Sequence, residues 1–187
     1  VLLSSISGER TSNVTVIGCG EVGRSSIHKS IQVGASVTAI DLNEDILKDL
    51  KNKYGENIST LLSGTDEAVS AIRSADLVIG AVLLPGRKPP IVITEEDIKY
   101  MEKGTVIVDV AIDQGGCVEG VNPNTHSDPF EMRNGVIVSA IANLPGAVPR
   151  TSSMELSTNL QKYVDYLLVE NWFDEYKNNE SLRPSLQ

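Results

Sequence analysis

Three glycines near the start of the chain stand at a spacing that suits phosphate binding. Gly18, Gly20 and Gly23 form G-x-G-x-x-G, directly after the apolar run 14–17 and directly before a helical pattern. Gly18 permits a tight turn, Gly20 lets a pyrophosphate approach the backbone, and Gly23 lets the helix pack closely on the sheet. The start of that helix offers N–H groups and the positive end of a dipole. The stretch predicts a turn that binds a dinucleotide.

An acidic residue follows at the position where such a turn needs one. Asp41 ends the second apolar run, 37–40, at close to the expected spacing of about 20 residues from the glycines. Its carboxylate can accept hydrogen bonds from a ribose 2′-hydroxyl and would repel a 2′-phosphate, which favours NAD over NADP. A lone G-x-G-x-x-G also occurs in glycine-rich turns of unrelated α/β proteins. The preceding strand, the following helix and the acid after the next strand make the motif specific.

A second candidate for chemistry lies just past another buried strand. The segment 108–116 reads VDVAIDQGG and places Asp113 beside a Gly-Gly pair, with Asp109 alternating with it. Ligands of open parallel sheets bind at the carboxyl ends of the strands, so this loop is expected beside the nicotinamide end of a dinucleotide. The structural alternative is an Asp that only begins a turn.

Two more strand ends carry loops that interrupt regular structure. In 141–150, IANLPGAVPR, Asn143 could bond a carboxamide or a ribose, whereas Pro145 and Gly146 indicate a turn. In 83–90, LLPGRKPP, the backbone could pass over a cofactor, and the two basic residues could be plain solvated charges.

The remaining reactive side chains do not form a site. His28 falls within the first helix and His126 in a polar loop, so both are expected to be structural or exposed. Cys19 lies between two loop glycines, where a helix N-terminus would lower the thiol pKa, but we interpret it as a small filler. The two cysteines show neither C-x-x-C nor zinc spacing, so no metal site is expected, and a reducing cytosol fits. No G-x-S-x-G is present.

The strands and helices that must position these residues are predicted to alternate along the chain. They predict an α/β fold, a doubly wound, mostly parallel Rossmann-type sheet with helices on both faces, plus a long C-terminal helix. Asn43 and Thr94 are expected to cap helices at their N-termini, and Gly34 occupies a C-cap position. The last helix is expected from 151–153 to about residue 176. We expect strands at 14–17, 37–40, 58–62, 77–82, 105–110 and 136–140, and shorter helices at 21–33, 44–53, 67–73 and from 94 to about 103.

Composition narrows the classes of partner. The 187 residues carry a net charge of −9, which argues against nucleic acid and anionic membranes as partners. Aromatic residues make up only 4%, so a base-stacking platform is not expected. No segment has the length of a membrane span and no signal peptide is evident, so a cytoplasmic location is expected. The chain does not begin with Met, and we expect it to be a piece of a longer protein.

Three stretches together resemble the NAD-binding domain of the alanine dehydrogenase family. They are VIGCGEVG, ADLVIGAVLLPGRKPP, and VIVDVAIDQGGCVEG with the later ANLPGAVPRTS. The resemblance covers nearly the whole chain, from about residue 1 to about residue 172. The related transhydrogenase nucleotide-binding subunit shares the fold and is the weaker match, because it lacks the Asp-Gln-Gly-Gly-Cys run.

The resemblance implies the roles of individual residues. Asp113 matches the family's catalytic aspartate. The implied cofactor contacts are Gly18, Gly20, Glu21, Val22 and Gly23 at the pyrophosphate, Asp41 at the adenosine ribose, Ser63 near the adenine, Val82 and Leu83 along the cofactor, Val110, Ala111, Ile112 and Asp113 at the nicotinamide, and Ile141, Ala142, Asn143 and Leu144 closing the site.

The resemblance also implies a two-domain, typically hexameric enzyme. It interconverts L-alanine and pyruvate plus ammonia using NAD. Residues 1–150 would be the NAD(H)-binding domain, and 151–187 a helix leading back to a substrate domain that is mostly absent from this chain. That domain supplies an Arg, a Lys and a His, so this chain alone is expected to bind NAD without turnover.

The chain departs from the family pattern at two places. Ile46 stands where a basic residue is often found, and MELSTNLQKYV differs at the start of the last helix. The first alternative function is a related amino-acid dehydrogenase or transhydrogenase. The second, from another class, is a non-catalytic NAD(H)-sensing module.

Overall fold

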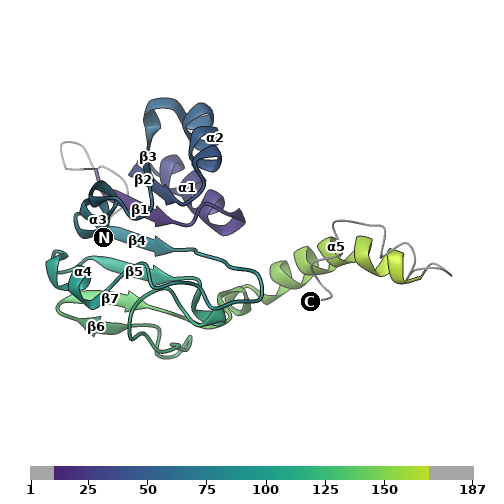
Figure 1. The fold of residues 1–187 in the computed structure, drawn as a ribbon. Helices are drawn as coiled ribbons and strands as arrows, with labels where there is room; N and C mark the ends of the chain where they lie inside the picture. Colours follow the sequence, from purple (N-terminus) through teal and green to yellow (C-terminus); the bar gives the residue numbers. More distant parts are fainter. Residues whose placement is uncertain (1–10, 169–187) are drawn as a thin grey trace. The chain divides into compact units, whose positions relative to one another are not determined.

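The computed structural model describes residues 11–168, drawn in colour in Figure 1. The part of the last helix that is predicted beyond residue 168 falls outside the described residues. The chain divides into two compact units, Val1–Ala142 and Asn143–Gln187, which are taken in turn.

The first unit is built on one seven-stranded sheet with the order β3-β2-β1-β4-β5-β7-β6. All neighbouring strands are parallel except β6 and β7. The strands are β1 (Asn13–Ile17), β2 (Ser36–Asp41), β3 (Ile58–Leu62), β4 (Leu77–Gly80), β5 (Val106–Asp109), β6 (Glu131–Arg133) and β7 (Val136–Ser139). The strand order reverses between β1 and β4, so the topological switch point lies at the carboxyl ends of these two strands.

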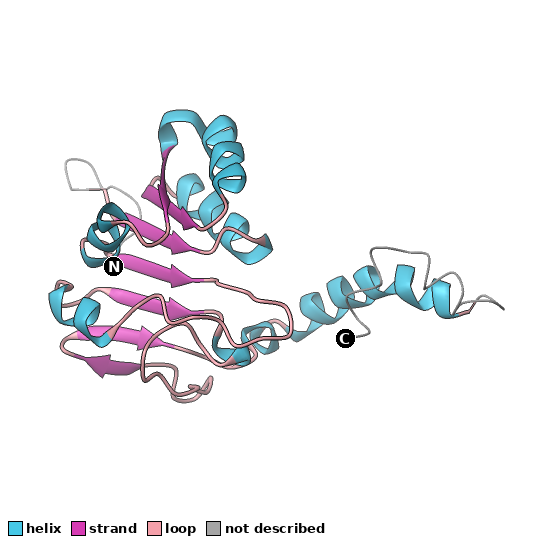
Figure 2. Cartoon of the chain, in the orientation of Figure 1, coloured by secondary structure: helices cyan, strands magenta, loops and turns pink. Residues whose placement is uncertain are grey.

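Helices cover both faces of the sheet, as the sequence predicts (Figure 2). They are α1 (Glu21–Gln32), α2 (Glu44–Tyr54), α3 (Asp66–Arg73) and α4 (Glu95–Tyr100), with short 3₁₀ turns η1 (Gly55–Asn57) and η2 (Ile112–Gln114). One apolar cluster joins α1 and α2 to the sheet through Ile27, Leu47 and Leu50. The other contains Ile72 and Ile98 from α3 and α4. The strands between them are therefore buried as parallel strands require.

Local capping follows the sequence. The Asn43 side chain accepts hydrogen bonds from the amides of Asp45 and Ile46 at the start of α2. Thr94 and Asp97 form a complete capping box at α4. Gly34, just past the end of α1, has a φ of +82° that suits glycine. These three predictions are confirmed.

Several boundaries differ from expectation for identifiable reasons. The strand expected at 77–82 ends at Gly80, which pairs with Ile17 and Asp109, because both neighbouring strands, β1 and β5, also end there. The helix expected to reach about residue 103 ends at Tyr100, because Met101 is extended with ψ 151°. β5 and β7 are each shorter than predicted. The antiparallel strand β6 was not predicted, since its three residues carry no apolar pattern.

The second unit contains η3 (Leu144–Ala147) and α5 (Pro149–Leu167). α5 begins two residues before the predicted start, because Pro149 fits the first helical position, where no N–H is needed. Its apolar residues Leu156, Leu160 and Val164 are exposed. Within residues 11–168, no helix is long and apolar enough to cross a membrane.

Candidate nucleotide-binding site

The glycine turn after β1 has a geometry that only glycine allows at two of its three positions. Gly18 has a φ of +87°, and a Cβ there would lie 2.7 Å from the carbonyl oxygen of Ala81. A Cβ on Gly23 would lie 1.9 Å from the carbonyl oxygen of Gly18. The predicted tight turn and the predicted close approach of α1 are both confirmed. They bring the helix start and the loop after β4 against the same turn.

Gly20 is different, because nothing in the protein fills the space beside it. Apart from the adjoining residues of the chain, no heavy atom lies within 4 Å of the position that a Cβ would take. Gly20 is the N-cap of α1, and its carbonyl accepts the first helical bond, from the amide of Arg24 at 2.8 Å. The amides of Glu21, Val22 and Gly23 precede that bond, so they face out of the helix end. Open space beside Gly20 and the donors at the helix start fit a pyrophosphate.

Asp41 is held beside this turn at the end of β2. Its Oδ2 accepts a hydrogen bond from the amide of Cys19 at 2.7 Å, and its Oδ1 accepts one from the amide of Asn43 at 2.9 Å. The amide of Ser63, after β3, donates to the carbonyl oxygen of Asp41 at 2.9 Å. The structure thus gathers Gly20, Asp41 and Ser63 at neighbouring carboxyl ends of β1, β2 and β3. Asp41 and Ser63 are both half-buried, so each side chain retains access to solvent.

The loops after β4 and β5 extend the same edge toward Asp113. Leu83 is 60% exposed, whereas Ala111 and Ile112 are buried, so only the backbone of the last two could reach a ligand. Asp113 is exposed on the turn η2, next to Gln114. Gln114, Leu83 and four residues of the loop after β4 line a pocket of about 490 Å³; those four are Pro85, Gly86, Arg87 and Lys88.

The other predicted site residues fall in both units and are described in turn. Val110 and Val82 are half-buried, and the amide of Val110 bonds the carbonyl oxygen of Gly80 at 2.8 Å. Ile141 pairs with Asn124 in a parallel bridge, and the amide of Ala142 donates to Asn124. In the second unit, Asn143 has a φ of +54° and caps η3, which begins at Leu144.

Sequence reasoning treated Asp109 only as a neighbour of Asp113, and the structure gives it a distinct environment. Its carboxylate is fully buried. It accepts hydrogen bonds from the backbone amides of Ala111, Cys117 and Val118. The sequence shows only that Asp109 is an acid at the end of a buried apolar run; the return of the chain to it at Cys117 and Val118 is seen only in the structure.

The two histidines are exposed and the two cysteines are buried. His28 is exposed, and its Nδ1 lies 3.4 Å from the hydroxyl of Tyr54. His126 is exposed in a loop. Cys19 is fully buried, and burial, followed by the nearby charge of Asp41, raises the pKa of its thiol to about 12. The burial of Cys19 fits the filler interpretation, and the net shift of its thiol pKa is upward rather than downward. Burial and the charge of Asp109 likewise raise the pKa of the Cys117 thiol.

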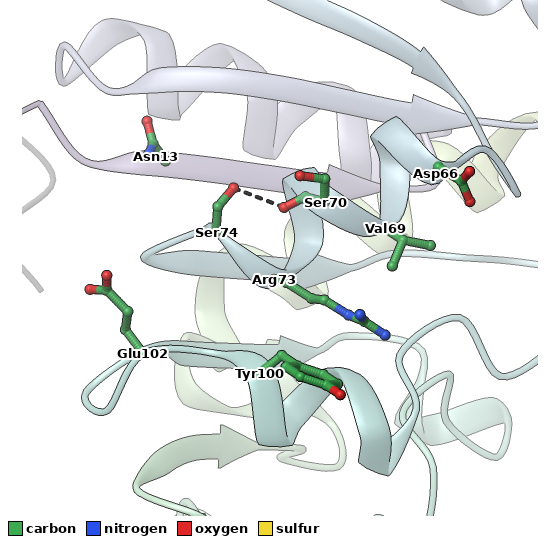
Figure 3. A pocket seen from close by; sticks show the side chains of 8 residues that line it. All are labelled: Asn13, Asp66, Val69, Ser70, Arg73, Ser74, Tyr100 and Glu102. Carbon is green, nitrogen blue, oxygen red and sulfur yellow. Dashed lines mark hydrogen bonds between the residues drawn. The ribbon is translucent and has the colours of Figure 1, made fainter.

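A larger pocket of about 610 Å³ lies at the opposite edge of the sheet, between α3 and α4 (Figure 3). The guanidinium of Arg73, which lines the pocket, stacks over the ring of Tyr100 at 4.5 Å from its centroid. The Nε of Arg73 donates a hydrogen bond to Oδ1 of Asp97 at 2.8 Å. Asn13, at the start of β1, also lines it. The amino ends of the strands lie here, whereas the site around Gly20 lies at the carboxyl ends. The pocket therefore does not belong to that site. Its ion pair and ring contact instead fasten α3 to α4.

Comparisons with known proteins agree with this geometry. A model of the family described as alanine dehydrogenase/PNT, C-terminal domain, matches residues 1–187. The alanine dehydrogenase of Bacillus subtilis (strain 168) is 43% identical over 187 residues, which is 100% of this chain and 50% of that protein. The alanine dehydrogenase of Staphylococcus haemolyticus (strain JCSC1435) is 39% identical over 183 residues, 97% of this chain and 49% of that protein. The chain therefore spans about half the length of these curated relatives.

Solved structures give the same result. An L-alanine dehydrogenase superposes with a TM-score of 0.87 and 36% identity, covering 98% of this chain and 51% of that one. A transhydrogenase from Sinorhizobium meliloti superposes with a TM-score of 0.79 over 90% of this chain and 49% of that one, but at 23% identity it supports the fold alone. The chain belongs to the alanine dehydrogenase/PNT C-terminal domain family, as the Rossmann-type NAD-binding domain of an alanine dehydrogenase-like protein.

Proposed function

We propose that the edge of the sheet around Gly20 binds NAD(H) and selects it over NADP(H). The observation that carries the proposal is the open space beside Gly20, framed by the start of α1 and by the carboxylate of Asp41. The amides of Glu21, Val22 and Gly23 would hold the pyrophosphate. Asp41 would accept from the adenosine ribose. The remaining contacts are proposed at Gly18, Ser63, Val82, Leu83, Val110, Ala111, Ile112, Asp113, Ile141, Ala142, Asn143 and Leu144.

The whole protein is proposed to be an alanine dehydrogenase. In that reaction L-alanine, NAD⁺ and water give pyruvate, ammonium, NADH and a proton, and the bound nicotinamide supplies the hydride acceptor. Asp113 is exposed beside the pocket after β4 and β5, so its carboxylate is the group of this chain that can orient the nicotinamide ribose and help to move a proton. The relatives named alanine dehydrogenase support this substrate.

Three further features belong to the same proposal. Residues 1–150 form the NAD(H)-binding domain and 151–187 lead back to a substrate domain. The complete protein is a cytoplasmic homo-oligomer, a hexamer by family resemblance, and its partner is the small-molecule substrate. Neither a nucleic acid nor a membrane is expected as a partner, because the chain carries a net charge of −9.

Two measurements test the proposal. NADH fluorescence is titrated against the 187-residue chain, and alanine-dependent reduction of NAD is followed by absorbance with the complete enzyme. The proposal expects NADH binding by the chain without turnover, and turnover by the complete enzyme. Turnover with another amino acid but not alanine would favour the related dehydrogenase, and hydride exchange between two nucleotides a transhydrogenase. Binding without any turnover by the complete protein would favour an NAD(H)-sensing module.

A further inference from the structure

The buried carboxylate of Asp109 closes the loop that carries Asp113. Asp109 ends β5 and is 0% exposed. Its Oδ1 accepts from the amide of Ala111 at 3.0 Å, where the loop begins. Its Oδ2 accepts from the amides of Cys117 at 2.8 Å and Val118 at 3.1 Å, where the loop returns. A single side chain therefore fastens both ends of the turn to the end of the strand.

The turn between these two ends has little freedom. The amide of Gln114 bonds the carbonyl oxygen of Ala111 at 3.0 Å, and the amide of Gly116 bonds the same oxygen at 3.1 Å. Gly115 and Gly116 have φ values of +106° and +74°, which side chains other than glycine rarely adopt. The side chain of Ile112 is buried, so packing also holds the turn in place. Asp113 is therefore exposed on a turn whose backbone position is fixed by these bonds.

Cys117 fastens the returning segment of the loop to its surroundings. Its carbonyl oxygen accepts from the amide of Val92 at 2.8 Å, and its thiol donates to Oδ1 of Asp109 at 3.4 Å. A Cβ on Gly80 would lie 2.4 Å from the Cys117 sulfur, so β4 leaves room for this thiol. The loop is thus bonded to Val92 and to Asp109 at the end of β5, and its thiol packs against Gly80 of β4.

The chemistry requires a carboxylate at this position. Three backbone N–H groups and one thiol point at the two oxygens, and an ionised carboxylate accepts at both without presenting a donor. An amide would turn one NH₂ group toward these donors and leave at least one buried donor without an acceptor, which is costly in a buried site. Asn is therefore a poor replacement, although it has nearly the same shape as Asp.

We propose that Asp109 is a positioning residue, which acts on the reaction by holding Asp113 at its place in the site. The proposal rests on the proposed function of Asp113. It predicts that Asp109→Asn lowers turnover because Asp113 is displaced, whereas NADH binding at the glycine turn is retained.

The first test uses the complete enzyme and a double-mutant cycle. Asp109→Asn is expected to lower kcat about tenfold or more, but less than about twofold in the Asp113→Asn background, because residues that act as one unit are not additive. Asp109→Asn should change the KM for NAD by less than about twofold, because the contacts at the glycine turn that bind NAD in both the ground state and the transition state are left in place. Equal effects of Asp109→Asn in both backgrounds would overturn the proposal. The matched control is Asp76→Asn, whose carboxylate also accepts a backbone N–H, from Asn13 at 2.7 Å, at the other edge of the sheet.

The second test does not need activity. Hydrogen exchange is measured by NMR on the 187-residue chain, where Asp109→Asn should speed exchange of the Cys117 and Val118 amides at least about tenfold. The amide of Gly18, which bonds the carbonyl oxygen of Ile40, serves as the internal reference. Unchanged exchange at Cys117 and Val118 would overturn the proposal even if the complete protein were found to lack alanine dehydrogenase activity.

A second variant covers the case in which Asp109→Asn does not fold. Gly116→Ala leaves every charge in place but puts a methyl group 3.0 Å from Oδ2 of Asp109, at a positive φ. It should therefore disturb the same contact, and a similar fall in kcat with an unchanged KM for NAD is expected. Normal kcat in a Gly116→Ala enzyme whose Cys117 amide exchanges rapidly would show that the loop tie does not position Asp113, and would overturn the proposal.

Discussion

The amide of Cys19 donates a hydrogen bond of 2.7 Å to Oδ2 of Asp41. This bond joins the middle of the glycine turn to the end of the next strand. It fixes the carboxylate in front of the turn, with Oδ1 held by the amide of Asn43. The acid proposed to meet the adenosine ribose is therefore oriented before any cofactor binds, which lowers the ordering cost of binding.

The first prediction is that the chain prefers NADH over NADPH and that the preference depends on Asp41. A 2′-phosphate would meet a fixed carboxylate, and close like charges cost several kcal/mol when poorly solvated. Asp41→Ser should weaken NADH binding by about 1–3 kcal/mol, as expected for a lost hydrogen bond to a charged group. Binding of both cofactors is measured by fluorescence titration.

The control for this prediction is Asp45→Asn, which removes a nearby carboxylate that is 89% exposed. It should leave the affinities and their ratio unchanged. Equal affinity of the wild-type chain for NADH and NADPH would contradict the assignment of Asp41.

A second prediction separates two glycines of one motif. Gly23→Ala should destabilise the fold by about 1–3 kcal/mol or more, because the new methyl group would meet the carbonyl oxygen of Gly18 at 1.9 Å and force the helix away. Gly20→Ala introduces its methyl group into open space, so the Tm should fall by no more than a few degrees. Its NADH affinity should nevertheless drop, since the methyl group occupies the place proposed for the pyrophosphate.

Thermal unfolding and NADH titration of the two variants provide the check. The pair serve as controls for each other, because the same methyl group is added at both positions. An unchanged NADH affinity in Gly20→Ala would contradict the proposal that the pyrophosphate binds beside Gly20.

The core of this site was predictable because its signals are local. The turn at Gly18, the close packing at Gly23 and the acid at Asp41 each follow from a short stretch in a strand–helix–strand context. The same applies to Asn43 and Thr94, whose caps need only residues two or three positions away. The mostly parallel sheet with helices on both faces followed from the alternation of elements.

The rest depended on contacts that are distant in sequence. The role of Asp109 arises because the chain returns to it at Cys117 and Val118, and no local pattern encodes that return. Likewise, β6 is defined by its pairing with β7 rather than by its own three residues. The pair of Arg73 and Asp97, which links two helices, was also invisible in the sequence.

A third prediction concerns acid stability and the pair of Asp97 and Arg73. Burial alone would raise the pKa of Asp97, but hydrogen bonds from the Thr94 hydroxyl and amide and from Arg73 hold it below its usual value. A carboxyl whose pKa is depressed on folding stabilises the protein above its unfolded pKa of about 3.9 and loses this contribution as the pH falls through the folded value. Asp97→Asn should therefore be less stable than the wild-type chain at pH 7, and the difference should shrink below about pH 4.

Urea unfolding at a series of pH values measures this difference. Glu96→Gln removes the same charge from the same first turn of α4 at an exposed position, so it should cost much less than Asp97→Asn. A gap between Asp97→Asn and the wild type that stayed constant down to pH 2 would contradict the titration of Asp97.

A fourth prediction is that both cysteines are inert in the folded chain. Cys19 and Cys117 are each fully buried, and the thiol pKa of Cys19 is raised to about 12. Because the thiolate is the reactive form, alkylation at pH 8 should be at least about a hundredfold slower in the native chain than in urea. Mass spectrometry follows the modification, and the unfolded chain serves as the control. Rapid labelling of Cys19 in the native chain would mean that the glycine turn opens readily.

The last prediction concerns Asp113 in the complete enzyme. Asp113→Asn keeps the shape of the side chain and removes its charge, and we expect turnover to fall about a hundredfold or more if the carboxylate takes part in proton transfer. The fold should survive, because Asp113 is exposed on a turn that is held by Asp109 and by the buried Ile112. NADH binding by the chain should change little, since the pyrophosphate and adenosine contacts lie at the glycine turn. Asp128→Asn is the matched control, because it makes the same change at another exposed loop carboxylate. Steady-state kinetics with alanine and NAD, together with the Tm of each variant, separate lost chemistry from lost folding. Normal turnover in Asp113→Asn would reduce Asp113 to a turn residue and leave the proton transfer to groups outside this chain.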